Sequence, residues 1–501
     1  MTQFKKPGIR KKTQKNKKFF LTSRKKCDKI KIKFHRRIFM SKSNADVSNI
    51  FTLEGRVPLY QAVPFGVQHI LAMFVPNIAP ITLLFGAAQA AGTAGDVTLP
   101  GLIQACMFCA GIVTLIQIVS LGGVVGSRLP VVMGISFTFL AASTNIVTKY
   151  GYAGLAGAVI AGGCIEGLLG LSAKYWKKLI PPVVSGSVVM SIGISIFAVG
   201  VNSFGGGGNW LLYFGAWQCW LIGGITLLTC ILVNCLVKGI SKQLNVLFAL
   251  IVGYIVTIII DNVAPVVGFD GPTKLVNFGI IAERVSTAGI VALPSILPGG
   301  ISFHLDAIIQ ITIVFLVSAV ETIGDTTTLC QIGLDRDITE KEVSGSLAAD
   351  GFGSAIAGVF GCSPITSFSQ NVGLVGMTKV VNRFAIGTGA AILVLCGLIP
   401  ALGGVFSTIP EPVLGGCTII MFGTIMSGGI GMLHKAGMSQ RNTLIVALSC
   451  SFGIGVTFSP TVLPQALYIR DIFGANMVAG VFVIAFILNL VLPKDMEIKR
   501  G

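Results

Sequence analysis

The stretch SPITSFSQNVGLVGMT, from Ser363 to Thr378, interrupts an apolar part of the chain with eight Ser, Thr, Gln, Asn or Pro residues. Pro364 and the polar run 366–371 oppose a continuous helix, which leaves backbone N–H and C=O groups without helical partners. At membrane depth such backbone is tolerated only against protein or a water-filled cavity. The stretch therefore predicts a broken segment inside a membrane protein.

The composition around this stretch indicates a membrane protein. Hydrophobic residues make up 53% of the chain and charged residues 11%, against about 25% charged residues in soluble domains. Apolar runs of about 20 residues, long enough to cross a bilayer, recur from residue 64 to residue 492. They lack strand-like alternation, so we predict an all-α polytopic protein rather than a barrel.

Glycines, prolines and charge clusters divide the chain into fourteen predicted transmembrane segments. These segments are 64–88, 99–122, 128–147, 150–172, 180–201, 211–236, 244–263, 304–333, 345–360, 364–378, 384–404, 411–431, 441–459 and 468–492. With the N-terminus inside, 16 of the 20 Lys and Arg residues after the N-terminal arm fall in inner loops. The four outside are Lys149, Lys274, Arg284 and Arg470. This asymmetry predicts that both termini are cytoplasmic.

The N-terminal arm differs in composition from the rest. Residues 1–42 contain 17 of the 37 Lys and Arg residues and a single acid, Asp28. We expect this basic segment to be disordered and to lie against anionic lipid headgroups. Nucleic acid is an alternative partner, but no folded nucleic-acid reader accompanies the arm, so we predict none. A second alternative is that the natural protein starts at Met40.

The 12 cysteines lie mostly in apolar segments, and only Cys106 and Cys109 have metal-like spacing. No second pair lies near them, so we expect buried, inert thiols and no metal site. The sequence also lacks an HExxH motif, paired CxxC motifs and a Ser-His-Asp signature. We therefore predict that the protein is not an enzyme.

Segments three and ten, seven apart in the count, resemble each other. Segment three contains PVVMGISFTFLAAS (Pro130–Ser143), and each segment has a Pro followed by Ser-Phe and a hydroxyl residue. An odd number of segments inverts the topology of the second half. Paired broken segments at matching positions of two halves point to a transporter site at the membrane midplane.

Acidic residues in segment eight are the strongest chemical signal. Glu321 and Asp325 are four residues apart and share one helical face. A charged group at the centre of a membrane helix costs about 2.5–3.5 kcal/mol, so each requires a reason. The pair indicates either a cation site or a substrate anchor with a proton acceptor. Asp350 and His69 are further titratable groups, although a helix end or an interhelical hydrogen bond would also explain them.

Gln370 lies in the broken stretch and carries both donors and an acceptor. Such a side chain suits a flat, uncharged ligand better than an ion. The half-helix after it would point its positive dipole end at the same place. We expect a planar heterocycle held by Gln370 and Glu321, with backbone amides of segments three and ten.

The residues Gln370-Asn371-Val372-Gly373, Thr378 and Arg383 resemble the signature of the nucleobase–ascorbate transporter family, also called the nucleobase:cation symporter-2 family. Its other marks occur in order as QHILAMF (Gln68–Phe74), ISFTF (Ile135–Phe139), ETIGD (Glu321–Asp325) and AADG (Ala348–Gly351). The resemblance covers about residues 55–493 and is strongest to prokaryotic members.

The resemblance implies two inverted repeats of seven segments, with short strands in segments three and ten. It divides the chain, after an arm of residues 1–54, into core halves 55–175 and 301–405 and gate halves 176–300 and 406–501. The gate domain would also form a homodimer. Transport would carry the substrate through the cytoplasmic membrane with protons and without a cofactor.

The resemblance also implies roles for individual residues. Substrate would contact Glu321, Gln370, Ser136, Phe137 and Ser369, with Asp350, Asp325, His69 and Asn371 in the polar network behind them. Gln370 favours xanthine or uric acid, since uracil carriers tend to have Glu there. Ser136 replaces a larger Asn of some xanthine carriers, which leaves the choice between xanthine and uric acid open. A uracil or mixed uracil–xanthine permease is the alternative, and a passive channel is a further one.

Overall fold

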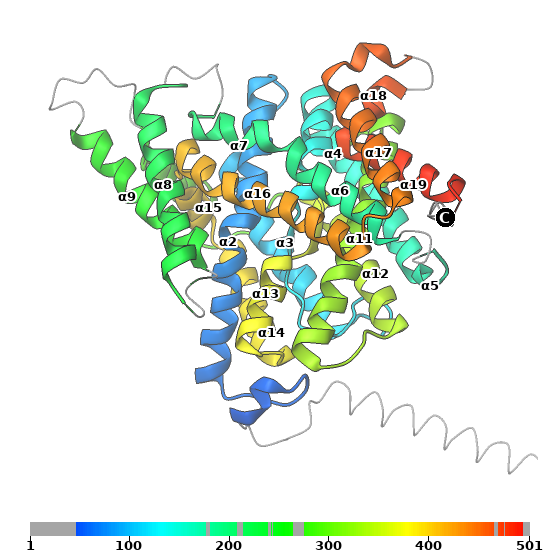
Figure 1. Ribbon diagram of the computed structural model, residues 1–501. Coiled ribbons are helices and arrows are strands. Elements are labelled where there is room, and N and C mark those ends of the chain that lie inside the picture. The colour runs from blue at the N-terminus through cyan, green and yellow to red at the C-terminus, as the bar shows by residue number, and fades with distance from the viewer. Residues whose placement is uncertain are drawn as a thin grey trace, which may run out of the picture.

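The computed structural model describes residues 47–176, 181–207, 214–238, 242, 244–263, 275–464, 469–474 and 476–493. These residues are mainly helical, with one two-stranded sheet (Figure 1). The longer helices are α2 (Leu59–Ala90), α3 (Leu99–Val119), α4 (Leu140–Leu171), α6 (Pro182–Ser195), α8 (Trp217–Leu236), α9 (Asn245–Val263), α11 (Leu305–Leu334), α12 (Glu340–Val359), α14 (Arg383–Gly397), α16 (Glu411–Ala436), α17 (Gln440–Phe458) and α19 (Met477–Val491). The shorter ones are η1 (Val47–Phe51), η2 (Phe137–Phe139), α5 (Ala173–Trp176), α7 (Phe197–Phe204), α10 (Gly279–Ala288), α13 (Ser369–Thr378), α15 (Pro400–Ser407), η5 (Pro460–Val462) and α18 (Ile469–Phe473).

Many of these helices are long and apolar enough to cross a membrane. Nine spans meet that test among the described residues, and the bent pair α14–α15 would make a tenth. One of the nine, Phe137–Leu171, joins η2 to α4, and another joins α6 to α7. The predicted class, an all-α protein with many membrane-spanning helices, is confirmed.

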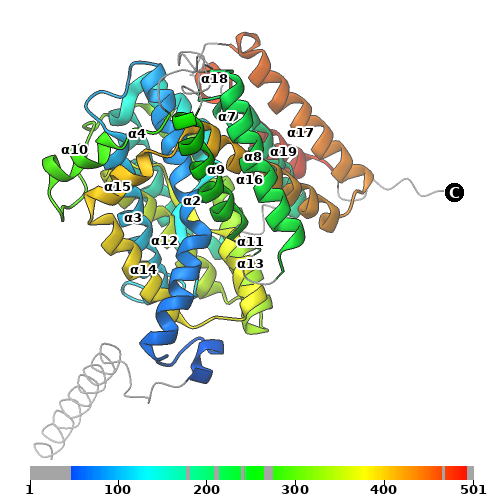
Figure 2. The ribbon, with the colours of Figure 1, turned by 90° about the vertical axis from the view of Figure 1, so that its left-hand side faces the viewer.

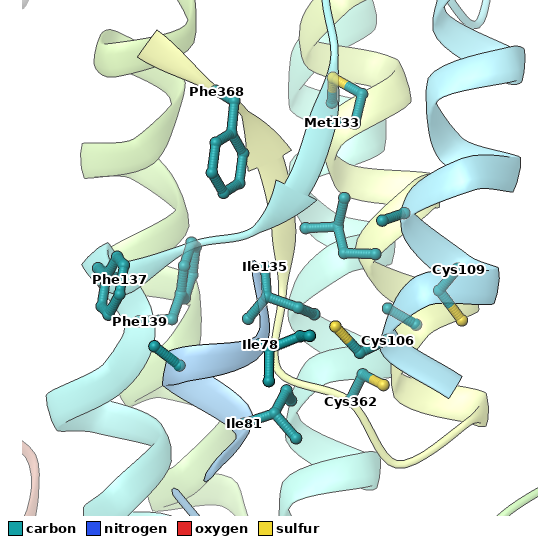
Figure 3. Close-up of a cluster of buried hydrophobic side chains, with 14 of the residues drawn as sticks. Ile78, Ile81, Cys106, Cys109, Met133, Ile135, Phe137, Phe139, Cys362 and Phe368 are labelled. Carbon is teal, nitrogen blue, oxygen red and sulfur yellow. The ribbon is translucent and has the colours of Figure 1, made fainter. Parts of the chain in front are cut away.

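The two broken segments meet in the sheet. Strands β1 (Met133–Ile135) and β2 (Ile365–Ser367) pair antiparallel, with Gly134 opposite Thr366 (Figure 3). Each strand runs into a short helix, η2 after β1 and α13 after β2. The backbone N–H of Phe368 donates to the Val132 carbonyl at 3.0 Å and extends the pairing. The strands thus lie in the two segments for which the resemblance implied them.

Side chains of neighbouring helices satisfy the outer edges of these strands. Thr114 Oγ1 on α3 accepts from the Met133 N–H, Asn77 Oδ1 on α2 accepts from the Ile135 N–H, and Ser354 Oγ on α12 accepts from the Ile365 N–H. These three distances lie between 2.8 and 3.0 Å. An unpaired N–H in an apolar interior is unfavourable, so these partners allow irregular backbone to persist among membrane helices.

The helices form two packed groups. In the first, α12 and α11 pack on α4, and α14 packs on α3 and α2; its apolar side chains surround the strands (Figure 3). In the second, α16 packs on α6, α7 and α8, and α17 packs on α19. Figure 2 shows α14 and α15 on the opposite side of the molecule from α17 and α19.

The described part of the N-terminal arm is folded. It contains η1, and the Asn382 side chain donates to the carbonyls of Asn49, Thr52 and Gly55 at 2.8 to 3.2 Å. Arg383 forms an ion pair with Glu54. Within the predicted disordered arm of residues 1–54, residues 47–54 therefore pack against the start of α14. The rest of the arm, with Met40, and also Lys274 lie outside the described residues.

Candidate functional site

The predicted site lies where α11 passes the ends of both strands. Glu321, in the middle of α11, accepts a hydrogen bond at 2.8 Å from Thr138, which belongs to η2 after β1. The other oxygen of Glu321 has no hydrogen-bond partner among the described residues. The acid is thus fixed by segment three and keeps one acceptor for a ligand.

Asp325 is fixed by segment ten instead. Its carboxylate accepts hydrogen bonds at 2.8 Å from Ser367, at the end of β2, and from Ser369, the first residue of α13. Because Asp325 follows Glu321 by one helical turn, both acids face the broken segments, as their spacing predicted.

Asp350 lies behind Asp325 and is fully buried in α12. Thr322 of α11 donates to its carboxylate. The Thr322 hydroxyl also lies 3.2 Å from the hydroxyl of Ser367, which donates to Asp325. These contacts place Asp350, Thr322, Ser367 and Asp325 in one row of polar side chains.

His69 and Asn371 hold α2 against α13. The Asn371 carboxamide nitrogen lies 3.1 Å from His69 Nδ1 and donates to the His69 carbonyl at 2.9 Å. Both side chains are buried. Their contact holds the beginning of α13 against α2, and among the described residues His69 Nε2 and Asn371 Oδ1 keep no hydrogen-bond partner.

The predicted substrate residues of segment three are packed rather than open. Ser136 accepts a hydrogen bond from the Thr138 N–H at 3.3 Å and caps η2. Phe137 is buried and meets Phe422 of α16 edge to face, with ring centroids 5.2 Å apart. This aromatic pair joins the strand region to the second helix group.

Gln370 and Ser369 are exposed at the start of α13. Within the described chain the Gln370 carboxamide has no hydrogen-bond partner. The first N–H groups of a helix also lack partners within it, and they carry its positive dipole end. Ser369, the residue before Gln370, contacts Asp325, which follows Glu321 by one helical turn. Gln370 and Glu321 thus belong to two segments that are in contact, and they offer donors and acceptors to a small polar ligand.

Sequence reasoning missed several residues that complete this site. The hydroxyls of Thr138, Thr322 and Ser367 bind the three acids, and Asn77 holds β1. Each of these three hydroxyl residues lies within two positions of a residue that was predicted to belong to the site. Another missed acid, Glu166, is buried in α4, and its place in an apolar segment was the available signal.

Comparisons with known proteins identify the family. A family model described as "Permease family" matches residues 60–462. The uric acid permease PucK of Bacillus subtilis is 35% identical over 426 residues, which cover 84% of this chain and 91% of PucK. The xanthine permease XanQ of Escherichia coli is 30% identical over 465 residues, covering 89% and 94%.

The fold also matches a solved transporter. The transmembrane domain of the cyanobacterial bicarbonate transporter BicA superimposes with a TM-score of 0.53 at 14% identity, covering 86% of this chain and 98% of that domain. At this identity the likeness concerns the fold alone.

Proposed function

Because this chain belongs to the nucleobase–ascorbate transporter family of permeases, we propose that it imports a purine nucleobase, xanthine or uric acid, across the cytoplasmic membrane together with protons. Its relatives are permeases of xanthine and of uric acid, and it is a transporter rather than an enzyme. The substrate would be the only small-molecule partner besides protons and lipid.

One observation carries the choice of substrate. An acceptor oxygen of Glu321 and the carboxamide of Gln370 are both free beside the strand pair. An oxidised purine presents ring N–H donors and carbonyl acceptors along its edges. Glu321 would accept from a ring N–H, and Gln370 and the first amides of α13 would bind a carbonyl and a neighbouring N–H. Phe137 would border the site, and Ser136 and Ser369 would keep its two ends in place.

The predicted architecture fits this mechanism. We propose fourteen segments in two inverted halves, with the first helix group as the core domain and the second as a gate domain that also forms a homodimer. The antiparallel pairing of β1 with β2 supports this proposal, since matching segments of inverted halves run in opposite directions. The Phe137–Phe422 contact joins the two groups at the site, where movement of the core against the gate would expose substrate to either side.

Proton coupling would use the three acids of the site, of which Asp350 is buried and Glu321 and Asp325 are half-buried. Glu321, Asp325 and Asp350 are bound by hydroxyl groups, and none of them takes part in an ion pair within the described residues. Burial without a counter-charge favours the neutral carboxyl, so substrate and proton can enter together. The proton gradient would supply the driving force, and no cofactor is needed.

Uptake into proteoliposomes tests the proposal. We expect labelled xanthine or uric acid to accumulate when the outside is acidic, and a protonophore to abolish the accumulation. Competition by unlabelled uracil, uric acid, guanine and xanthine identifies the preferred base, and counterflow separates a carrier from a passive channel. Uptake that ignores the pH gradient would contradict the proposed coupling.

A further inference from the structure

The contact between α4 and α12 buries an acid that the proposed transport site does not use. Glycines bring the two helices close: a Cβ atom on Gly163 would lie 2.6 Å from the Gly351 carbonyl, and one on Gly170 would lie 2.7 Å from the Ala348 nitrogen. Glu166 lies on α4 between these two glycines. Helices that approach this closely leave no room for a side chain to swing out, so its carboxyl group stays in the interface.

Glu166 has no partner for its charge. Its side chain is 3% exposed, and neither carboxyl oxygen has a hydrogen-bond partner among the described residues. Asp350 on α12 is 0% exposed and has one oxygen without a partner, Oδ1. Glu166 and Asp350 each precede a glycine at the closest approach of the two helices, where a Cβ atom on Gly351 would lie 2.1 Å from the Gly167 nitrogen. Two acids thus meet in the same apolar contact, each with unused acceptor capacity.

The surrounding charges make full ionisation of both acids unfavourable. The groups that act on Asp350 from α11 are Asp325 and Glu321, which are also acidic. In the described part of the chain, the ion pairs join Lys149 to Asp306, Arg336 to Glu342 and Arg383 to Glu54, so none of them neutralises Glu166 or Asp350. Buried like charges without a counter-ion are avoided by protonation, as in carboxyl pairs that share one proton.

We propose that Glu166 and Asp350 form a carboxyl pair that holds a proton between α4 and α12. The pair would extend the row of polar side chains that runs from Asp325 through Ser367 and Thr322 to Asp350. Its use in transport depends on the proton coupling proposed above. Glu166 would then be the proton-binding residue farthest from the substrate. It would not contact the base, and it would act through its effect on Asp350.

Infrared spectroscopy of the purified protein tests the pair without transport. In a pH titration, protonated carboxyl groups give a C=O stretching band. We expect Glu166→Gln to remove one component of this band and to shift the midpoint at which the Asp350 component titrates, because interacting acids titrate as a unit. Glu411→Gln is the control, since Glu411 is a half-buried acid of α16 that accepts a hydrogen bond from Ser203 of α7; it should leave the midpoint of Asp350 unchanged.

Transport assays then test the role of the pair. In proteoliposomes, Glu166→Gln should lose accumulation of labelled xanthine against its gradient while exchange across the membrane persists, and Glu166→Asp should restore accumulation. A wild-type midpoint for Asp350 in Glu166→Gln, or normal accumulation with a normal pH profile, would overturn the inference. If wild-type protein showed the infrared coupling but no proton-driven purine uptake, the proposed function would fail and the carboxyl pair would stand.

Discussion

The acids of the site are bound by hydroxyl groups, and this choice of partner has a chemical consequence. Thr138 binds Glu321, Thr322 binds Asp350, and Ser369 binds Asp325. A hydroxyl can donate to a carboxylate and can accept from a protonated carboxyl. An Arg or Lys partner would stabilise only the ionised form. Hydroxyl partners therefore let each acid gain or lose a proton without leaving a buried group unpaired, as a proton-coupled carrier requires.

Replacing Gln370 by Glu should weaken purine recognition. The substitution removes the N–H donors of the carboxamide and leaves an acceptor-only group when ionised. A lost hydrogen bond with an unpaired partner costs about 1–3 kcal/mol, which corresponds to a rise of about 5- to 150-fold in KM for xanthine. Uptake kinetics of labelled xanthine measure the change, with Gln89→Glu, at an exposed position near the end of α2, as control. An unchanged KM would exclude Gln370 from the substrate site.

Removing the Glu321 carboxyl should eliminate transport. Glu321→Ala deletes the free acceptor oxygen and leaves the Thr138 hydroxyl without its partner. We expect no measurable uptake, whereas the amount of protein in the membrane should equal that of the wild type. Glu283→Ala, at an exposed position of α10, provides the control. Normal uptake by Glu321→Ala would refute the assigned role.

Sequence reasoning found the acids of the site more readily than their partners. An acid in an apolar segment is rare and therefore informative, which is why Glu321 and Asp325 could be predicted. Hydroxyl residues are common in membrane helices, where many simply bond to the carbonyl four residues earlier, as Thr226 and Thr257 do here. Thr138 and Thr322 differ from these only in being next to predicted site residues, and that position does not show that their partners lie on other helices.

Among the elements, the strand pair depends most on its surroundings. Strands of three residues cannot persist alone, and here α2, α3 and α12 supply the missing hydrogen bonds. The break in segment ten could be predicted because Pro364 and the polar residues after it oppose a helix, whereas the strands themselves were implied only by the family resemblance. The break between segments three and four was also predictable: Gly151 interrupts α4 with φ of 68° and ψ of −170°, a conformation open essentially to glycine alone.

Gly134→Ala should disrupt this sheet. A Cβ atom there would lie 2.5 Å from the Phe368 ring and 2.8 Å from Asn77 Oδ1, which accepts from the Ile135 N–H. Overpacking of this kind costs about 1–3 kcal/mol, so thermal unfolding of the purified protein should begin at lower temperature and uptake should fall. Gly387→Ala, where a Cβ meets nothing within 4 Å, should leave both unchanged. Equal stability of the two variants would contradict the packing described for β1.

The first turn of α12 should make stability depend on pH. Partial burial alone would raise the pKa of Glu342, but hydrogen bonds from Arg336 and Thr339 bring it below its ordinary value. A lowered pKa in the folded state means that the stabilisation is present above the ordinary carboxyl pKa and is lost as the pH falls. We expect acidification to lower the unfolding temperature less in Glu342→Gln than in the wild type. Parallel curves for the two proteins would exclude this contribution.

At the scale of the whole molecule, several predicted inner loops contact one another. Arg383 pairs with Glu54, and the Gly126 N–H donates to the Gly345 carbonyl at 2.8 Å. The predicted outer loops meet one another elsewhere: Thr93 donates to the Val147 carbonyl at 2.7 Å, and the Ser302 N–H donates to the Ala153 carbonyl at 2.9 Å. These contacts join predicted inner loops to inner loops and predicted outer loops to outer loops, and the side that each set faces stays a prediction. Segment boundaries near residues 177–180, 208–213 and 264–274 lie outside the described residues.

Cysteine labelling can test the proposed count of segments. Asp96 and Asp337 are both exposed, and seven proposed segments separate them, so they must lie on opposite sides of the membrane. The positive-inside rule places Asp337, beside Arg336 and Lys341, in the cytoplasm. With the exposed Cys164 and Cys235 replaced by Ser, an impermeant maleimide should label Asp96→Cys in intact cells and Asp337→Cys only after permeabilisation. Labelling of both in intact cells would require an even number of crossings between them and would refute the inverted halves.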